Sequence, residues 1–549
     1  MTLQHELPSH PKQKRASKPK VRTGCFTCKC IRTGRQCEGY WTPRSTTLLP
    51  KALAPAPVVD SNIEPRALEF FYLRTAPQLA GFFGDAFFLG SVLRHSLAEP
   101  AIRQAIAAIG ALHERSATGK LLSRRDSPSP DVHIQLYNRS IRAVLGKIRA
   151  GQHALPLVAT TNVLYACFEI FQGDVAAAVT HIQSGIKLLQ SWREKNGGPV
   201  RPWGQQYQSS ESHFLETEIG PLLSLFNTNV IGGDRGKRAN FLMNPLDEHG
   251  TLLVTDRFET LNEARVALID MITDVTWDLD TLDQDDSLVH RPFCDVDAFG
   301  IKNRTERNLQ RWQDKVNDLV RRKQSSWNKR ERQMADVINT IRLSTNFGLL
   351  SYQTECECDW DLRRADYEEL VRLAEGIVSD RARFPDDLSR TLSLDFGMIF
   401  PLHAVAWKCR WPKIRRQGLD LLLRIPKREW LFEAAHYHAI FSRIMEIEEA
   451  CLGLPAGEVP DENWLPPEHV RIHDFIVNKK SGPHGKALYS VSFFMKPQGL
   501  DGPLACYTEE IQLPSSQPVE AALPINMIGR RLQIDTEVSW ACVHRIDVL

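Results

Sequence analysis

Four cysteines near the N-terminus have the spacing of a metal site. They lie within 13 positions, whereas the other eight cysteines of the chain are scattered. The four are Cys25, Cys28, Cys30 and Cys37. Cys25-x2-Cys28 places two thiols on one tight turn, as a tetrahedral zinc ion requires, and Cys30-x6-Cys37 could return a second pair. Bound zinc can contribute roughly 10–16 kcal/mol to the folding of such a short segment. The alternative is four cysteines in a flexible arm that bind nothing.

Basic residues surround these cysteines. Residues 1–50, termed the head, contain ten Lys and Arg residues against two acidic ones, a net charge of +8. Residues 51–549, termed the body, carry 58 basic and 64 acidic residues, a net charge of −6. We therefore expect the head, and not the body, to contact a polyanion such as DNA. The candidate DNA-contacting residues are Lys20, Arg22, Lys29, Arg32 and Arg35. The alternative interpretations of the basic run are a nuclear import signal and a solubilising tail.

Composition divides the chain into four parts. Residues 1–20 are polar and basic and are predicted to be a disordered arm. Residues 21–40 hold the cysteine cluster. Residues 41–63 are rich in proline, which removes helical hydrogen bonds and predicts an extended linker. Residues 64–549 have helical periodicity and are predicted to form one large helical domain.

Apolar residues in this last part recur every three or four positions, which predicts one-sided helices. The series that carry this signal are residues 102–112, 134–148, 175–189, 264–275, 309–319 and 334–341. Residues 157–171 are apolar nearly all round, which predicts a buried helix that pairs with the following one in an αα-hairpin. Alternation in residues 487–495 and 504–513 predicts a small β-hairpin. The predicted fold class is therefore mainly α.

Three local features invite a chemical interpretation. Cys356 and Cys358 resemble a metal or redox pair, but no second ligand pair lies near them in the sequence, which favours ordinary helix-end cysteines. Residues 277–286 mix acidic and bulky apolar side chains, as activation segments do, and a solvated loop is the simpler interpretation. Cys167 lies within the predicted buried helix and is expected to be unreactive.

The sequence offers no sign of an enzyme or of a membrane protein. It contains no G-x4-G-K-[ST] phosphate loop, no H-E-x-x-H zinc helix and no G-x-S-x-G elbow. Its most apolar long stretch, residues 155–171, is interrupted by polar residues and is too short for a bilayer span. Residues 1–20 contain no apolar export signal, which favours a reducing cytosolic or nuclear setting for the cysteines.

Around the cysteines, RTGCFTCK and CIRTGRQCEGY resemble the two ends of the binuclear zinc-cluster domain of fungal transcription regulators. In that family six cysteines bind two zinc ions, and the segment after the second cysteine reads CGG-type triplets in DNA. Cys25 and Cys28 match the first two cysteines, and Cys30 and Cys37 match the last two. The third and fourth cysteines and the reading helix have no counterpart, so the four present can saturate one ion only. A splice variant or an incorrect gene model would explain the gap.

The resemblance extends into the body. EPRALEFFYLRTAPQLAGFF, EPAIRQAIAAIGALHE, YACFEIFQGDVAAAVTHIQSGIKLL and PLHAVAWKCRWPKIRRQGLDLL are similar to the helical regulatory region of the same family, over most of residues 64–450. The resemblance implies a nuclear, zinc-dependent, sequence-specific DNA-binding regulator of RNA polymerase II genes, specific to one pathway such as secondary metabolism. The partners that it implies are double-stranded DNA, a second copy of the chain, and the transcription machinery or a small-molecule effector. It implies no catalytic residue. The alternative is a helical scaffold that derives from such a regulator and has lost DNA reading.

Overall fold

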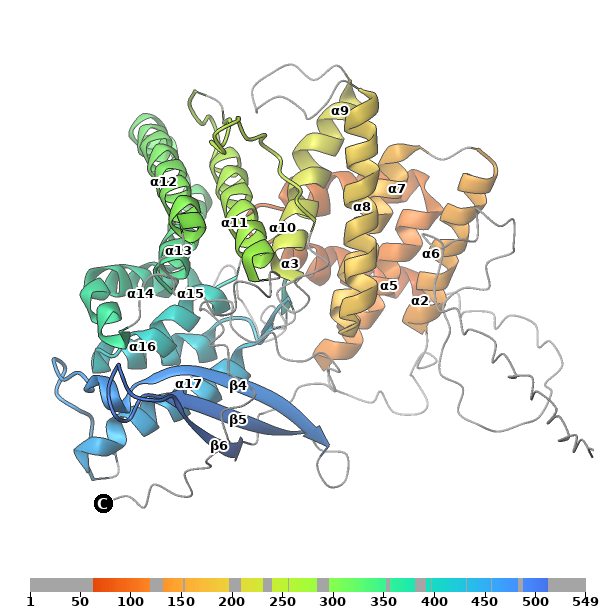
Figure 1. The fold of residues 1–549 in the computed structure, drawn as a ribbon. Helices are drawn as coiled ribbons and strands as arrows, with labels where there is room; N and C mark the ends of the chain where they lie inside the picture. Colours follow the sequence, from red (N-terminus) through yellow and green to blue (C-terminus); the bar gives the residue numbers. More distant parts are fainter. Residues whose placement is uncertain are drawn as a thin grey trace, which may run out of the picture. The chain divides into compact units, whose positions relative to one another are not determined.

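The described part of the chain is mainly α-helical, as predicted (Figure 1). The head and most of the predicted linker lie outside it. The computed structural model describes residues 63–118, 132–151, 154–196, 209–230, 239–254, 256–283, 296–351, 356–380, 392–395, 397–430, 432–455, 457–481 and 487–511.

The first helices pack around α5, whose apolar face contacts α2, α6 and α7. The helices are α2 (Ile63–Phe70), α3 (Ala76–Ala80), α4 (Val92–Ala98), α5 (Pro100–Thr118), α6 (Val132–Arg149), α7 (Leu155–Gln172), α8 (Val175–Lys195), α9 (Ser210–Phe214) and α10 (Gly220–Val230), with π-helical segments at Phe71–Thr75, Ala86–Ser91 and Leu215–Ile219. Helix α2 begins at Ile63, inside the predicted linker, because Pro65 falls in its first turn, where a missing N–H costs nothing.

The predicted αα-hairpin is formed by α7 and α8, which lie side by side (Figure 1). Nearly every residue of α7 is buried, as its continuous apolar pattern predicts. Gly173 ends α7 in the left-handed conformation, at φ 83°, which a residue without Cβ adopts freely. Asp174 then caps α8, because its side chain accepts a 2.9 Å hydrogen bond from the Ala177 N–H. The turn is therefore encoded by two adjacent residues.

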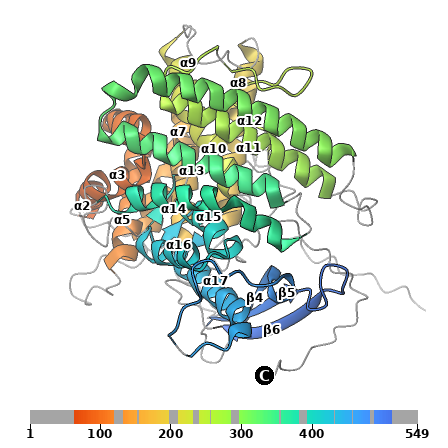
Figure 2. The same ribbon diagram turned by 90° about the vertical axis from the view of Figure 1, so that its left-hand side faces the viewer.

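The later helices include a long antiparallel pair, α11 and α12 (Figure 2). The bounds are α11 (Leu261–Asp283), α12 (Val296–Lys323), α13 (Lys329–Ser351), α14 (Arg364–Val378), α15 (Ile399–His403), α16 (Pro412–Arg424) and α17 (Ala434–Glu449), with a π-helical segment at Ala404–Lys408 and 3₁₀ turns at Gln324–Ser326, Glu357–Arg363 (η7), Ala450–Leu452 and Glu468–Val470 (η11). No helix among the described residues is long and apolar enough to span a membrane.

The loop predicted over residues 277–286 is wrong for residues 277–283, which continue α11. One acidic residue of this segment, Asp278, faces a cation on the neighbouring helix, which favours the helical conformation. Arg304 of α12 pairs with Asp278 and lies 3.2 Å from Asp274. Residues 284–286 lie outside the described part of the chain.

The predicted hairpin is confirmed, but it belongs to a larger sheet. Antiparallel strands β4 (Ile472–Ser481), β5 (Ala487–Met495) and β6 (Ala505–Ile511) form one sheet, and the short β1 (Leu392–Ser393), β2 (Arg428–Glu429) and β3 (Phe432–Glu433) form another. Strand β4 went unpredicted because a register shift between Ile472 and Asp474 interrupts its period of two. Helix α17 contacts the larger sheet through the 2.7 Å ion pair of Arg443 with Glu509.

Candidate functional site

The metal and DNA candidates of the head lie outside the described residues. They are Cys25, Cys28, Cys30, Cys37, Lys20, Arg22, Lys29, Arg32 and Arg35. Their zinc and DNA roles stay predictions. Cys167, by contrast, is described, and it is fully buried in α7 as predicted, where burial raises the pKa of its thiol well above its ordinary value.

A group of polar side chains, termed the Tyr137 cluster, is buried between α6, α7 and α8. It consists of Tyr137, Glu169 and His181. The Tyr137 hydroxyl donates a 2.7 Å hydrogen bond to Oε1 of Glu169 and lies 3.1 Å from Nε2 of His181. The Tyr137 ring stacks on Phe168, with 4.1 Å between ring centroids, which closes one side of the cluster. The cluster therefore has internal hydrogen bonds in apolar surroundings.

Burial favours the uncharged forms of the ionisable side chains in the Tyr137 cluster. It raises the pKa of Glu169 to about 7, although the hydrogen bond from Tyr137 opposes this shift. Burial also lowers the pKa of His181 to about 4, so that imidazole is uncharged at neutral pH. The cluster can take up a proton near neutral pH, but its three side chains present little surface to a ligand.

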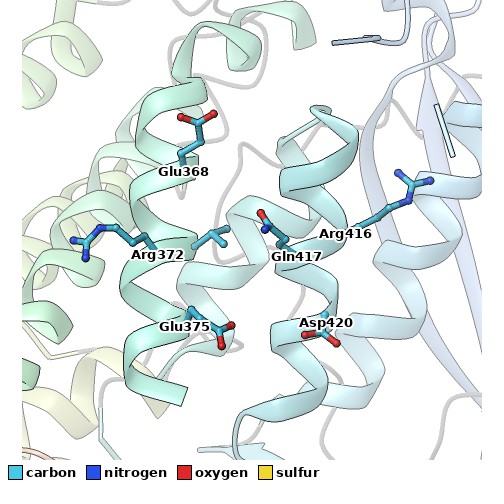
Figure 3. A pocket seen from close by; sticks show the side chains of 7 residues that line it. Glu368, Arg372, Glu375, Arg416, Gln417 and Asp420 are labelled. Carbon is cyan, nitrogen blue, oxygen red and sulfur yellow. The ribbon is translucent and has the colours of Figure 1, made fainter. Parts of the chain in front are cut away.

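An open groove of about 600 Å³ lies between α14 and α16 (Figure 3). Its lining residues are Glu368, Val371, Arg372, Glu375, Arg416, Gln417 and Asp420. Val371 is the one apolar residue among these seven, and the aliphatic parts of the other side chains supply most of the remaining lining. None of the seven has a nucleophilic or imidazole side chain, and the groove therefore resembles a contact surface rather than a catalytic pocket.

The charged residues of the groove are already paired within the fold. Glu375 accepts two hydrogen bonds from Arg424, the shorter of 2.7 Å. Arg416 forms a bidentate pair with Glu449 of α17, and Figure 3 shows its guanidinium turned away from the groove. The spacing of the lining residues, three and four apart on each helix, was visible in the sequence. Which two helices face each other was not.

A second set of charged side chains, termed the Glu448 network, is buried where the helices meet the larger sheet. Its members are Glu357, Lys408, Arg410, Arg415 and Glu448. Glu448 accepts hydrogen bonds from Arg410 and Arg415, of 3.1 and 2.6 Å, and from the N–H of Ile472 at the start of β4. Glu357 lies 2.7 Å from the Lys408 ammonium and 2.8 Å from the Arg410 guanidinium. The network therefore connects η7, α16 and α17 with the first residue of the sheet.

The Glu448 network is held in its charged state. Burial by itself would raise the pKa of Glu448, but the charges of Arg410 and Arg415 and their hydrogen bonds hold it at about 2. The pKa of Glu357 is lowered in the same way, because the positive charges of Lys408 and Arg410 outweigh the effect of burial. The sequence contained no signal for this network, because its members are spread over residues 357–448 without a motif.

Cys356 and Cys358, predicted to be ordinary helix-end cysteines because no second ligand pair lies near them in the sequence, have a carboxylate beside them in the fold. Glu468 of η11 lies against both thiols, with its Oε2 3.4 Å from the Cys356 sulfur and 3.2 Å from the Cys358 sulfur. Candidate ligand atoms of all three residues lie within 4.8 Å of one another. No sequence signal could have found Glu468, since it is 112 positions from Cys356.

Two comparisons with known proteins show what the chain is similar to. Residues 67–223 match a family described as fungal specific transcription factor domain. Over 222 residues, 31% of the chain, the sequence is 27% identical to the aspercryptin biosynthesis cluster-specific transcription regulator atnN of Emericella nidulans, and the match spans about a third of that relative, 34%. The resemblance predicted for the body is thus confirmed for residues 67–223. Residues 67–223 therefore resemble a fungal specific transcription factor domain, and both similarities support a role in transcription regulation.

Proposed function

We propose that the protein is a nuclear, zinc-dependent regulator that binds DNA sequence-specifically and controls RNA polymerase II genes of one pathway, such as one of secondary metabolism. The observation that carries this proposal is the presence, in one chain, of a segment similar to a fungal specific transcription factor domain and a cationic head with four closely spaced cysteines. The relative named as a biosynthesis cluster-specific regulator supports the pathway-specific part.

The head would supply the metal and DNA contacts. Cys25, Cys28, Cys30 and Cys37 offer four thiolates, which fit one tetrahedral zinc ion. Zinc binding would supply the folding free energy that this short segment cannot obtain from a hydrophobic core, and it would hold the neighbouring basic residues in place. Lys20, Arg22, Lys29, Arg32 and Arg35 would contact phosphates and give salt-dependent affinity. Recognition of CGG-type triplets would need the segment with the third and fourth cysteines that this sequence lacks.

The body would regulate when the head acts. Its negative charge makes it a poor DNA ligand, and the groove between α14 and α16 offers a surface for a protein or effector. A second copy of the chain or the transcription machinery are the partners that this role requires. The alternative function, a helical scaffold that no longer reads DNA, is favoured by the missing third and fourth cysteines.

Selection of binding sites from random duplexes tests the proposal. The experiment compares the chain as written with a version that carries a restored segment with the third and fourth cysteines. We expect the restored version to enrich a CGG-containing motif and the chain as written to bind duplexes without preference, with affinity that falls as salt rises. The matched control is the restored version with C25S and C28S, which should enrich nothing. Failure of the restored version to enrich a motif would favour the scaffold.

A further inference from the structure

The body holds a second candidate metal site, at the contact between η7 and the start of β4. Three groups of the kinds that bind zinc converge there, namely two thiols and one carboxylate. They come from Cys356 and Cys358 beside η7 and from Glu468 in η11. This convergence is produced by the fold, because the cysteines and the glutamate are more than 100 positions apart.

The distances suit a tetrahedral ion. With bonds of about 2.3 Å to sulfur and 2.0 Å to oxygen, ligand atoms on one zinc ion lie about 3.5–3.8 Å apart. The Glu468 Oε2 atom is 3.4 Å from the Cys356 sulfur and 3.2 Å from the Cys358 sulfur. Small rotations of the side chains would therefore suffice to admit an ion. All three residues are half-buried, which leaves a route for the ion from solvent.

A buried histidine beside the carboxylate is the second observation. The Nε2 atom of His473 lies 3.1 Å from Oε1 of Glu468, and the His473 side chain is only 7% exposed. This nitrogen nevertheless makes no hydrogen bond of ordinary geometry. The imidazole lies against Oε1 of the carboxylate while Oε2 faces the two thiols, so it is placed to position Glu468 as a ligand.

The surroundings can hold the ligands and balance their charge. The backbone N–H groups of Glu357 and Cys358 each donate a 3.1 Å hydrogen bond to Glu468, which fixes its carboxylate. The Cys358 N–H also lies 3.4 Å from the Cys356 sulfur, as a donor to a thiolate would. Arg471 donates a 3.0 Å hydrogen bond to the carbonyl of Glu357 and brings a positive charge beside the thiols. The same guanidinium forms a bidentate pair with Asp361, with hydrogen bonds of 3.0 and 2.7 Å, so its positive charge is shared between that carboxylate and the thiols.

We propose that Cys356, Cys358 and Glu468 bind a thiophilic divalent cation such as zinc, with His473 positioning the carboxylate through its other oxygen. On binding, the two thiols release their protons and form metal–sulfur bonds, with no change of oxidation state. The ion would fasten η7 to η11 and so connect the helices to the sheet at a second point, close to the Glu448 network. This site is independent of the zinc proposed for the head.

The test uses the full chain with the four head cysteines replaced by serine, so that head zinc is not counted. After incubation with zinc and removal of free metal, we expect about one zinc ion per chain by elemental analysis. Adding C356S and C358S should abolish this zinc, whereas the matched control C451S/C506S, which removes two other cysteines of the described region, should keep it. With Co²⁺ as the probe, thiolate-to-cobalt absorption bands should appear in the parent and disappear in the double variant.

H473Q tests the residue that positions the carboxylate without touching the thiols, and we expect zinc affinity to fall by roughly 10- to 100-fold. Near-ultraviolet circular dichroism without metal checks that each variant is folded. A head-cysteine variant that binds no zinc, or a C356S/C358S variant that binds as much as its parent, would overturn the site. Loss of all zinc on replacing the head cysteines would refute this site and leave the proposed function standing. In the chain with its four head cysteines intact, zinc that disappears wholly with C356S and C358S would support this site and count against a zinc ion in the head.

Discussion

The buried carboxyl groups of the Tyr137 cluster and the Glu448 network differ in protonation state. In the cluster, Glu169 has no cation beside it, so burial dominates and favours its protonated form. In the network, Glu448 is more deeply buried, yet two guanidinium groups keep it ionised. The difference shows that burial alone does not decide the charge of a side chain; the charges that share its surroundings do. The first arrangement suits a protonation-sensitive packing contact, and the second a rigid joint.

Removing the anion of the network should have the largest effect. E448Q leaves Arg410 and Arg415 buried without a countercharge, and we expect it to lower the free energy of unfolding by about 3–5 kcal/mol. Urea titration at neutral pH measures this change. The control is E446Q, since Glu446 lies nearby on α17 in an exposed pair with Arg443, where we expect less than about 1 kcal/mol. Equal effects of the two variants would contradict the buried joint.

The free energy of unfolding should depend on pH in opposite directions through the two regions. The pKa of Glu169 is about 7 in the folded chain against an ordinary 4.5, so the folded state alone holds this proton between these values. The free energy of unfolding should therefore fall as pH rises from 4.5 to 7, by on the order of 3 kcal/mol. For Glu448, at about 2 in the folded chain, the contribution is lost as pH falls from 4.5 towards 2.

The E169Q variant separates the two pH dependences of the free energy of unfolding. Glutamine can still accept the hydrogen bond from Tyr137 but cannot titrate, so we expect the loss of stability between pH 4.5 and 7 to disappear. The acid-side loss below pH 4.5 should remain. Thermal unfolding midpoints measured across pH 3 to 8 on E169Q and the parent check both statements. A parent whose stability does not change between pH 4.5 and 7 would show that Glu169 is not held protonated.

The close packing of α2 on α5 provides a test with a smaller expected effect. A Cβ on Gly110 of α5 would lie 2.2 Å from the carbonyl oxygen of Ala67 in α2, so the two helices approach too closely for alanine. We expect G110A to destabilise the fold by about 1–3 kcal/mol. Urea titration should then show a lower unfolding midpoint. An unchanged midpoint would mean that α2 does not pack on α5 in this way.

The same substitution at Gly146 of α6 should have the smallest effect and the opposite sign. No atom lies within 4 Å of a Cβ built there, and alanine is the better helix former. We expect G146A to stabilise the chain by about 0.5–1 kcal/mol in the same titration. A loss of stability would indicate a contact on this face of α6.

Most of the helices, and the pairing of α7 with α8, were readable from the sequence because their signals are local. A period of 3.6 residues identified α5, α6, α8, α11, α12 and α13, and Gly173 with Asp174 marked the turn between α7 and α8. The β5–β6 hairpin was readable from its alternation. Strand β4 and the helical end of α11 were not, since a bulge broke one pattern and cross-helix ion pairs stabilised the other.

The sequence by itself determined that a cationic, cysteine-rich head precedes an acidic body with helical periodicity, and the family resemblance seen in the body is matched by the comparison over residues 67–223. The tertiary structure decided which distant groups meet. It placed Glu468 on Cys356 and Cys358, and it gathered the members of the Glu448 network. The physical reason is that helix and strand periodicity depends on residues close together in the sequence. Ion pairs and metal ligands depend instead on distances in space, which only the packed chain defines.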